Sequence, residues 1–472
     1  MTERPFTGPH PALGARQSAF ALSFACLFLC LARPVSAADS PLLSPQSAST
    51  SQSQPSASPD RLRLSTSITL SPAQKELLAL LAEADQLYLT EKYEAAGTKG
   101  LDAIGRGAQP SDDLRWKIAN SLAWTGRLNE SYGQYALLLN GPYDGQARLA
   151  LANAERWQGR ADLARPLYSQ VLALDPSNTG AREGLENGER ELRPSTTVSF
   201  SGSKDSNDMQ RMALTVAHRW RDETGTKIYE VETRGMRDQI NPANLRVQSS
   251  DVTLRFQPLD VQFQPRAYVN FQATPRASAF AGVRLKLGEG PTHLYLDRLN
   301  WGVVAVSARA MDAGLSAYHA GIESTYGFGL GQLYGRASVY KVSDSNTVLT
   351  TSLKFTPAWR PLGPGIKAYV TTDTRDVRFN TPNYWSPAIG SGTASVGLLG
   401  EWSHQDWFFY TAGQIGHPMY GESGTNWSAS AAAKRWLNKD YALGFNLWGL
   451  SSRRDGANYR AKSATVNLEK LW

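Results

Sequence analysis

The chain has 472 residues, more than one ordinary soluble core accommodates, and this length predicts two or more structural units. The mean hydropathy is −0.37 and hydrophobic residues make up 41% of the chain, which excludes a membrane protein built from many apolar helices. The formal net charge is +7, and residues 195–472 hold 30 basic against 22 acidic side chains, so the basic excess lies in the C-terminal part. Such an excess suits nucleic acid, anionic lipid or an anionic solute, and the charge alone does not choose between them.

Residues 1–37 have the features of a secretory signal peptide. An apolar run from Ser18 to Leu31 follows Arg16, and the small residues of Val35-Ser36-Ala37 form the kind of site that a signal peptidase cleaves. The run is too short to cross a bilayer comfortably. Both cysteines of the chain lie in this run. We therefore expect the mature protein to begin near Ala38 and to lack disulfides and cysteine-based metal sites or nucleophiles.

Two further regions precede residue 195. Residues 38–71 are dominated by Ser, Pro, Gln and Ala and are predicted to form a disordered linker. Ser71-Pro72 resembles a helix N-cap with proline at the first helical position, and apolar residues at helical spacing follow. Segments that begin at Glu91, Gly126 and Gly159 repeat at intervals of 35 and 33 residues, close to the period of tetratricopeptide repeats. The sequence predicts about three such repeats over 72–193, against a generic helical bundle with coincidental spacing.

From residue 195 to residue 472 the pattern is that of β-strands, with scarcely a helical segment. Stretches of about ten residues alternate in polarity and are separated by turn residues. One stretch, for example, sets Leu333 and Val339 against Arg336 and Tyr340. A period of two also fits a soluble sandwich or propeller. We predict about sixteen antiparallel strands, with fourteen or eighteen as the alternatives because residues 292–310 divide ambiguously.

Three features favour a membrane location for this sheet: the signal peptide, aromatic residues near strand ends, and Trp472 at the end of an alternating strand. Aromatic girdles lie where hydrocarbon meets lipid headgroups, and only a closed barrel satisfies every backbone group in lipid. The sequence therefore predicts an outer-membrane β-barrel over 195–472, with the repeats in the periplasm and Trp472 as the signal for barrel insertion. The aromatic residues near predicted strand ends are Trp220, Trp402, Trp407, Phe408, Phe409, Tyr410 and Trp436.

One predicted loop carries Asn383-Tyr384-Trp385-Ser386-Pro387. This motif, together with the order of signal peptide, helical repeats and barrel, resembles the outer-membrane exporters of bacterial exopolysaccharides, namely the cellulose-export subunit and the poly-N-acetylglucosamine porin. On its own, the motif fits equally well a rigid turn packed on a strand end. The chain departs from the cellulose-export subunit in having about three repeats where that subunit has many more.

The resemblance implies that a synthase pushes a polysaccharide passively through the barrel, while the repeats bind partner proteins or nascent polymer. Aromatic faces and hydrogen-bonding side chains suit sugar rings, and the basic balance of the barrel favours a neutral or anionic polymer. An equally good alternative is that the luminal charges pair with one another and fill a narrow pore. By alternation, the candidates for the luminal face are Glu230, Glu232, Arg234, Arg255, Arg266, Arg336, Tyr340, Lys354, Tyr369, Asp373 and Arg375.

The sequence does not indicate an enzyme. Five histidines follow residue 37, and none has the spacing of a nucleophile's base or a metal ligand, so we expect no cofactor and no metal. The expected partners are outer-membrane lipid, the barrel-assembly machinery, polysaccharide, and periplasmic or inner-membrane synthase components, with no nucleic acid. The rival hypothesis is a non-conducting barrel that anchors a protein-interaction domain, or acts as a surface receptor or assembly factor. A plugged lumen would favour this rival.

Overall fold

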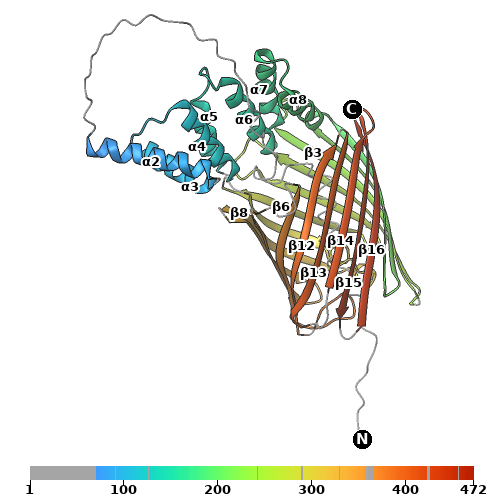
Figure 1. The fold of residues 1–472 in the computed structure, drawn as a ribbon. Coiled ribbons are helices and arrows are strands. Elements are labelled where there is room, and N and C mark those ends of the chain that lie inside the picture. Colours follow the sequence, from blue (N-terminus) through green and yellow to red (C-terminus); the bar gives the residue numbers. More distant parts are fainter. Residues whose placement is uncertain are drawn as a thin grey trace, which may run out of the picture. The chain divides into compact units, whose positions relative to one another are not determined.

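The computed structural model describes residues 71–472 except 91, 126, 242, 289–290, 329, 358, 360–364, 388, 405, 422–425 and 455–456. The predicted signal peptide 1–37 and the predicted linker 38–71, apart from Ser71, lie outside the described residues. Helices come first and strands follow (Figure 1). The described chain divides into two compact units, one that ends at Ala154 and one that runs over Glu155–Trp472.

The first unit consists of paired helices. Ser71 and Gln74 form a capping box at the start of the first helix: each side chain binds the backbone N–H of the other residue. Small residues allow close packing between neighbours, since a Cβ on Gly100 would lie 2.5 Å from Cγ1 of Ile118. Among the described helices, none is both long enough and apolar enough to cross a membrane. The helices are α2 (Pro72–Leu89), α3 (Tyr93–Gly105), α4 (Asp112–Trp124), α5 (Leu128–Ala136) and α6 (Asp144–Trp157), the last of which runs into the second unit.

The second unit begins with one more helical pair, α7 (Ala161–Leu174) and α8 (Thr179–Leu192). A Cβ on Gly184 would lie 2.4 Å from the ring of Tyr168, so the absence of a side chain at Gly184 lets the two helices approach each other. Asn178 caps α8 by accepting a hydrogen bond from the backbone N–H of Ala181. The chain then enters the first strand at Ser195.

The strands form a closed antiparallel barrel. Each strand pairs with its neighbours in sequence, and the first pairs with the last, Ser195 opposite Leu471, which closes the sheet. The predicted number of sixteen strands is confirmed. The strands are β1 (Ser195–Asp205), β2 (Met209–Arg221), β3 (Lys227–Ile240), β4 (Leu245–Pro258), β5 (Arg266–Thr274), β6 (Ser278–Leu287), β7 (Thr292–Asn300), β8 (Ser316–Phe328), β9 (Gly331–Val342), β10 (Thr347–Pro357), β11 (Ile366–Val377), β12 (Ser391–His404), β13 (Trp407–Tyr420), β14 (Asn426–Trp436), β15 (Tyr441–Arg454) and β16 (Ala457–Leu471).

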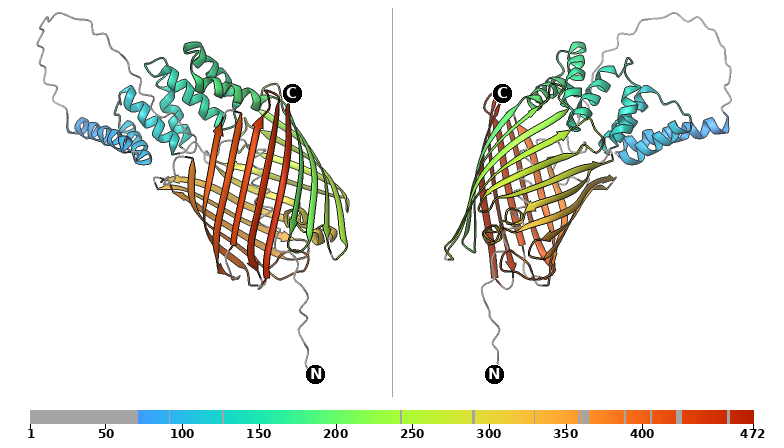
Figure 2. Two further views of the ribbon diagram at one scale, coloured as in Figure 1. Left: turned by 45° about the vertical axis from the view of Figure 1, so that its right-hand side comes forward. Right: turned by 180° about the vertical axis from the view of Figure 1, so that it is seen from behind.

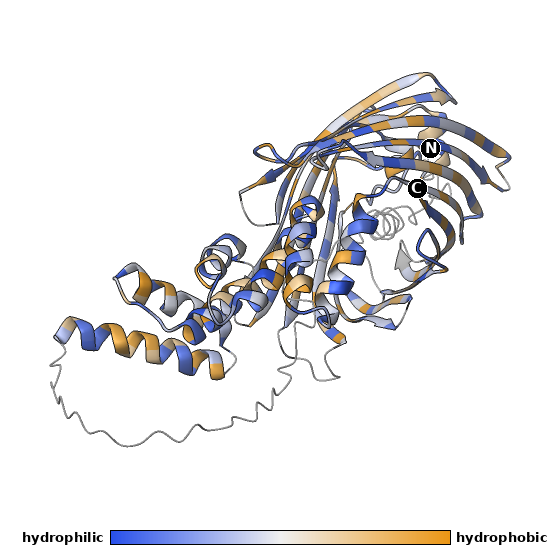
Figure 3. Cartoon of the chain, turned by 90° about the horizontal axis from the view of Figure 1, so that it is seen from above, coloured by the Kyte–Doolittle hydropathy of each residue, from blue (hydrophilic) through white to orange (hydrophobic). Residues whose placement is uncertain are grey.

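The outer face of the barrel is an apolar band. Alternate residues along the strands are large, hydrophobic and exposed, and the hydropathy colours of Figure 3 alternate along the strands accordingly. A soluble protein rarely exposes an apolar surface of this extent, whereas a barrel in lipid requires one. The sheet is therefore a transmembrane β-barrel of the outer-membrane type. The band includes Val198, Phe200, Met212, Leu214, Val252, Leu254, Val269, Phe271, Ile322, Leu353, Val370, Val396, Leu398, Ile415, Phe445, Leu447, Val466 and Leu468.

The ambiguous segment 292–310 is one strand followed by two short helices, and the expectation of scarcely any helix beyond residue 195 is wrong here. The helices α9 (Trp301–Val304) and α10 (Ala308–Asp312) follow β7 and are capped by the side chains of Asn300 and Ser307. Because Trp301, Ala308 and Met311 are almost completely buried, this segment packs against the inner face of the barrel rather than extending into solvent. Figure 2 shows the two short coils near the end of the barrel remote from α7 and α8, here called the distal end.

Candidate functional site: the barrel lumen

The luminal candidates from the sequence all lie on the face of their strands opposite to the exposed apolar band. Exposure alternates along each strand, and these residues fall on its less exposed face. This orientation does not by itself show that they bind a substrate. The structure places Glu230, Glu232 and Arg234 on β3, Arg255 on β4, Arg266 on β5, Arg336 and Tyr340 on β9, Lys354 on β10, and Tyr369, Asp373 and Arg375 on β11.

Four of these residues form one ionic network across β3, β4 and β5. Nη1 of Arg255 lies 2.5 Å from Oε1 of Glu230 and 2.8 Å from Oε2 of Glu232. Nη2 of Arg266 lies 3.8 Å from the other carboxylate oxygen of Glu230. Register explains the contact, because Glu230 and Arg255 are direct cross-strand partners.

Two further ion pairs extend this network around the lumen. Nη2 of Arg234 lies 2.7 Å from Oδ2 of Asp251, whose other carboxylate oxygen accepts a hydrogen bond of 2.9 Å from Asn270. Nη2 of Arg284 lies 3.0 Å from Oε1 of Glu323. We call this inner face of β3–β9 the charged wall, and its charges are largely paired with one another. The charged wall comprises Glu230, Glu232, Arg234, Asp251, Arg255, Arg266, Arg284, Glu323 and Arg336.

Aromatic rings cover other luminal cations. The guanidinium of Arg336 lies 5.8 Å from the centre of the Tyr295 ring, and Nζ of Lys354 lies 4.7 Å from the centre of the Tyr369 ring. Such contacts stabilise a cation without neutralising it. Aromatic rings thus contribute to holding these two cations on the inner face.

The opposite side of the lumen has a different chemistry. Cross-strand register aligns Asn446, Thr465 and Ser201 in one row, and Asn467, Ser199 and Thr215 in the row beside it. These side chains are small and uncharged, and they carry hydroxyl or amide groups. We call the middle part of this face, on β14–β16, β1 and β2, the hydroxyl wall. It comprises Ser199, Ser201, Thr215, Ser430, Ala432, Asn446, Thr465 and Asn467. The same strands carry the ion pair of Lys434 with Glu469 nearer the helical end and Arg211 nearer the distal end, outside this wall.

The hydroxyl wall has unused hydrogen-bonding capacity. Asn467 is 3% exposed, and its Nδ2 has no hydrogen-bond partner among the residues that the structure describes. Buried polar groups usually find partners, in the protein or in ordered solvent. A molecule in the lumen would not reach this buried amide, but the polar groups of Ser199, Ser201 and Asn446 are only half-buried and could contact such a molecule.

Two insertions cross the lumen at the distal end. The first, residues 301–315, packs Met311 against Met236 and Val247 on one side of the barrel. The second, residues 378–390, packs Trp385 against Leu450 on the other side. Together we call them the distal bridge.

The two insertions also contact each other. The rings of Trp301 and Tyr384 meet edge to face with centres 5.3 Å apart, and the Ser307 hydroxyl donates a hydrogen bond of 2.5 Å to the carbonyl oxygen of Asn383. The bridge therefore runs continuously from β3 and β4 to β15, narrowing the lumen at this end.

The family-like motif Tyr384-Trp385-Ser386-Pro387 is part of this bridge. The Tyr384 hydroxyl donates a hydrogen bond of 3.0 Å to Asp344, and Ser386 Oγ accepts one of 2.7 Å from the backbone N–H of Thr381. All four residues of the motif are buried. The motif is therefore more than a simple turn on a strand end, because its loop folds into the lumen and packs there.

Arg375 and Tyr340 also belong to the bridge rather than to a free luminal surface. Arg375 is 3% exposed, donates a hydrogen bond of 2.7 Å to the carbonyl oxygen of Trp385, and lies 5.9 Å from the centre of the Trp301 ring. Tyr340 packs on Trp301 and stacks on His319. Both side chains fix the position of the bridge.

The aromatic residues near strand ends divide between two environments. Trp402, Trp407 and Phe409 stack on one another on the outer face at the end near α7 and α8, as an aromatic girdle would. Phe408 and Tyr410 instead alternate to the inner face, opposite Ser403 and Glu401. Trp436 lies beneath the guanidinium of Arg190 from α8, 4.6 Å from the ring centre. For Phe408, Tyr410 and Trp436, the prediction of a place in the girdle is wrong.

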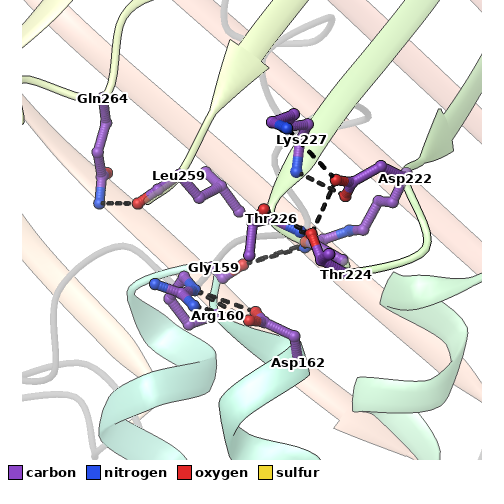
Figure 4. Close-up of polar contacts among 11 residues, drawn as sticks. Gly159, Arg160, Asp162, Asp222, Thr224, Thr226, Lys227, Leu259 and Gln264 are labelled. Carbon is purple, nitrogen blue, oxygen red and sulfur yellow. Dashed lines mark hydrogen bonds and ion pairs between the residues drawn. The ribbon is translucent and has the colours of Figure 1, made fainter. Parts of the chain in front are cut away.

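Helices α7 and α8 are packed on the rim of the barrel, and Figure 4 shows one of the contacts. Nη1 of Arg221 donates a hydrogen bond of 3.4 Å to the carbonyl oxygen of Gly159, at the start of α7, and one of 2.9 Å to that of Gly225. Gly225 has a φ of 74° in the β2–β3 turn, and a Cβ there would lie 3.0 Å from Cβ of Asp162. Only glycine fits this turn without strain.

A second contact joins α8 to the closing strands. Nη2 of Arg193 lies 2.7 Å from Oδ1 of Asp440, and its Nε donates a hydrogen bond of 3.1 Å to the carbonyl oxygen of Trp472. The indole of Trp472 donates a hydrogen bond of 2.8 Å to Oγ1 of Thr196 on β1. The last helix and the barrel seam are thus linked.

Sequence reasoning missed several partners in the lumen. The carboxylates Asp251 and Glu323 and the buried pair of Arg211 with Asp238, 2.6 Å apart, were not singled out. Each lies at an alternating inward position. Only the strand register brings these residues to their partners, and a single sequence does not reveal that register.

Comparison with known proteins finds similar structures but no similar sequence. Neither a protein-family model nor a curated protein matches the chain. Among solved structures, a bacterial polysaccharide outer membrane secretin is similar at 12% identity with a TM-score of 0.47, over 60% of this chain and 99% of that one. Pseudomonas aeruginosa OccK11 is similar at 9% identity with a TM-score of 0.34, over 59% and 96%. CdiB from Acinetobacter baumannii is similar at 10% identity with a TM-score of 0.34, over 59% and 60%.

Proposed function

We propose that the barrel is an outer-membrane conduit for a neutral or weakly anionic polysaccharide. The observation that carries this proposal is the pairing of two unlike walls in one lumen. The charged wall largely neutralises itself, and the hydroxyl wall offers many weak hydrogen-bonding groups. A polymer rich in hydroxyl groups would find many weak contacts along such a lumen and no strongly binding charge that would hold it back.

The proposal assigns an orientation and a role to the helices. The barrel turns at the end near α7 and α8 are short, whereas the two long insertions, 301–315 and 378–390, lie at the distal end. Outer-membrane barrels have short periplasmic turns and longer surface loops. We therefore take the helical end as periplasmic and the helices as repeats of the tetratricopeptide type, which bind partner proteins or polymer before it enters the lumen.

The distal bridge favours a second function. If the two packed insertions keep the lumen closed at all times, the barrel cannot conduct and serves only as an anchor for the helices. Under the export proposal, the bridge must instead leave a passage or move aside. Conductance therefore distinguishes the two functions.

The test is a planar-bilayer measurement on the full-length mature chain. We expect a small conductance for the unmodified protein and a larger one for Trp385→Ala, because Trp385 attaches the second insertion to β15. Added neutral glucan oligosaccharides should block the current transiently. Thr233→Ala, on the outer face of β3 and away from both the lumen and the bridge, is the control and should leave the conductance unchanged.

Two outcomes would overturn the export proposal. One is zero current for both the unmodified protein and the Trp385→Ala variant, with normal barrel mobility on a heat-modifiability gel. The other is unchanged surface polysaccharide in a strain that lacks the gene. Either result would favour the anchor function.

A further inference from the structure

Five basic side chains lie on the outer face of the barrel near its distal end and do not line the lumen. All five are exposed. They extend over the neighbouring strands β16, β1, β3 and β4, with Gln210 of β2 between them. We call this surface the basic face. It comprises Lys204, Arg237, Arg246, Arg460 and Lys462.

Strand register brings like charges together on this face. Lys204 and Lys462 are direct cross-strand partners. The same cross-strand row continues from Lys204 through the uncharged Gln210 and Gln239 to Arg246 on β4. Like charges directly opposite each other destabilise a sheet unless an anion lies between them.

The protein itself supplies little negative charge to this face. Asp208 in the β1–β2 turn lies 3.9 Å from Nζ of Lys204, at the outer limit of an ion pair. Among the described residues, Arg237, Arg246 and Lys462 have no carboxylate within ion-pair distance. Among the residues that the structure describes, the face is therefore an arrangement of cations with little neutralising charge, which an anion from outside could supply.

The place of the basic face identifies the kind of partner. On the same outer face of β1, the apolar Val198 and Phe200 precede Lys204, and on β16 Val466 and Leu468 follow Lys462. A ligand bound here must therefore join an anionic head to an apolar tail. On the far side of the barrel, the same level carries Arg298 on β7, Lys341 on β9 and Asp376 on β11. There Tyr318 lies between the two cations, so among the described residues no two basic residues at this level are direct cross-strand partners as Lys204 and Lys462 are.

We propose that the basic face binds the phosphate groups of a phosphorylated glycolipid in the outer leaflet, of the lipid A type. This inference rests on the orientation given in the proposed function, which places the distal end at the cell surface. Lys and Arg side chains extend along apolar surface toward headgroups, and two phosphates on one sugar headgroup match cations spread over neighbouring strands. The bound lipid would also relieve the repulsion between Lys204 and Lys462.

The test measures binding of lipid A to the full-length mature protein in neutral detergent by native mass spectrometry. Lys204→Gln combined with Lys462→Gln should weaken binding about thirtyfold, because each cation beside an anionic headgroup contributes roughly fivefold. Arg298→Gln combined with Lys341→Gln is the charge-matched control. It removes two outward basic residues near the same end, on β7 and β9, and should leave the affinity unchanged.

Three results would overturn the inference while the barrel remains folded by heat-modifiability. The two double variants could lose the same affinity, lipid A lacking one phosphate could bind as tightly as the intact form, or phosphatidylglycerol could bind as tightly as lipid A. The last result would indicate a general anionic-lipid surface.

A separate measurement tests the orientation. Asn207→Cys places a thiol in the β1–β2 turn at the distal end, and an impermeant maleimide should label it on intact cells. Labelling without lipid A binding would refute the glycolipid site and leave the orientation intact. Failure to label would contradict the proposed orientation instead.

Discussion

The charged wall and the hydroxyl wall line the same lumen, yet they are stabilised in different ways. In the charged wall, long side chains reach across strands and pair, as Arg255 does with Glu230. In the hydroxyl wall, short side chains such as Ser199 and Ser201 extend too little to form such a network. The comparison shows that two faces with the same strand geometry can differ in how their polar groups are satisfied. Long charged side chains neutralise one another on the first face, whereas most of the short uncharged side chains on the second face stay half-buried at the lumen.

The largest expected effect concerns the seam beside the hydroxyl wall, where β16 meets β1. Trp472 holds this seam through its indole, its backbone N–H to the carbonyl oxygen of Pro194, and its contact with Arg193. We expect Trp472→Asp to remove most of the assembled barrel, because it deletes the cross-seam contact together with the aromatic ring that we propose as the insertion signal. Heat-modifiable mobility in the membrane fraction measures the assembled form.

The control for this experiment is Trp472→Phe, which keeps the aromatic ring and loses only the indole hydrogen bond. It should assemble nearly normally. Normal mobility of the Trp472→Asp protein would contradict the role of this residue in insertion.

A smaller effect should separate a buried luminal ion pair, which lies outside both walls, from the hydroxyl wall in stability. The ion pair of Arg211 and Asp238 is nearly inaccessible to solvent, and Asp238→Ala would leave a buried cation without its partner. We expect a loss of about 3–5 kcal/mol in the free energy of unfolding. Asn467→Ala in the hydroxyl wall should cost about 1 kcal/mol or less, because Nδ2 of Asn467 has no hydrogen-bond partner to lose.

Urea unfolding of the barrel in detergent gives both values. Replacing the pair together, Arg211→Met with Asp238→Leu, should recover most of the loss, since the penalty comes from the unpaired charge. Equal losses for Asp238→Ala and Asn467→Ala would show that the buried ion pair is no more important to stability than a polar group without a partner.

The strands of this fold could be predicted from the sequence, because alternation and turn residues are local. Leu333 and Arg336, for instance, lie on the outer and inner faces as their parity requires. The bridge could not be predicted. Nothing local to Trp301 or Trp385 shows that one packs on Tyr384 across the lumen and the other on β15.

For the luminal site, the sequence likewise predicts the face on which each residue lies but not its partners. Parity assigns Arg234 and Arg375 to the same inner face, but the first pairs with Asp251 and the second is buried in the bridge. The difference depends on register and on the two insertions, both of which are tertiary properties. The sequence therefore predicts which residues face inward and leaves open which charges act on the pore.

The smallest expected effect concerns ion selectivity, and it tests whether paired charges influence the pore. Removing Arg234 and Asp251 together, as Arg234→Gln with Asp251→Asn, deletes one positive and one negative charge that already neutralise each other. We expect the reversal potential in a salt gradient to change little. Ser201→Asp adds one carboxylate to the hydroxyl wall, where the cross-strand neighbours Ala213 and Thr465 carry no charge.

That unpaired carboxylate should shift the permeability ratio toward cations by roughly twofold, because a charge at a low-dielectric wall is screened less than in bulk water. The shift should shrink as the salt concentration rises, whereas the double variant should stay near the unmodified protein at every concentration. If removal of the Arg234–Asp251 pair shifted selectivity as much as Ser201→Asp, the charged wall would not be neutralised by its own pairs. The lumen would then act on a passing polymer through net charge rather than through hydrogen bonds.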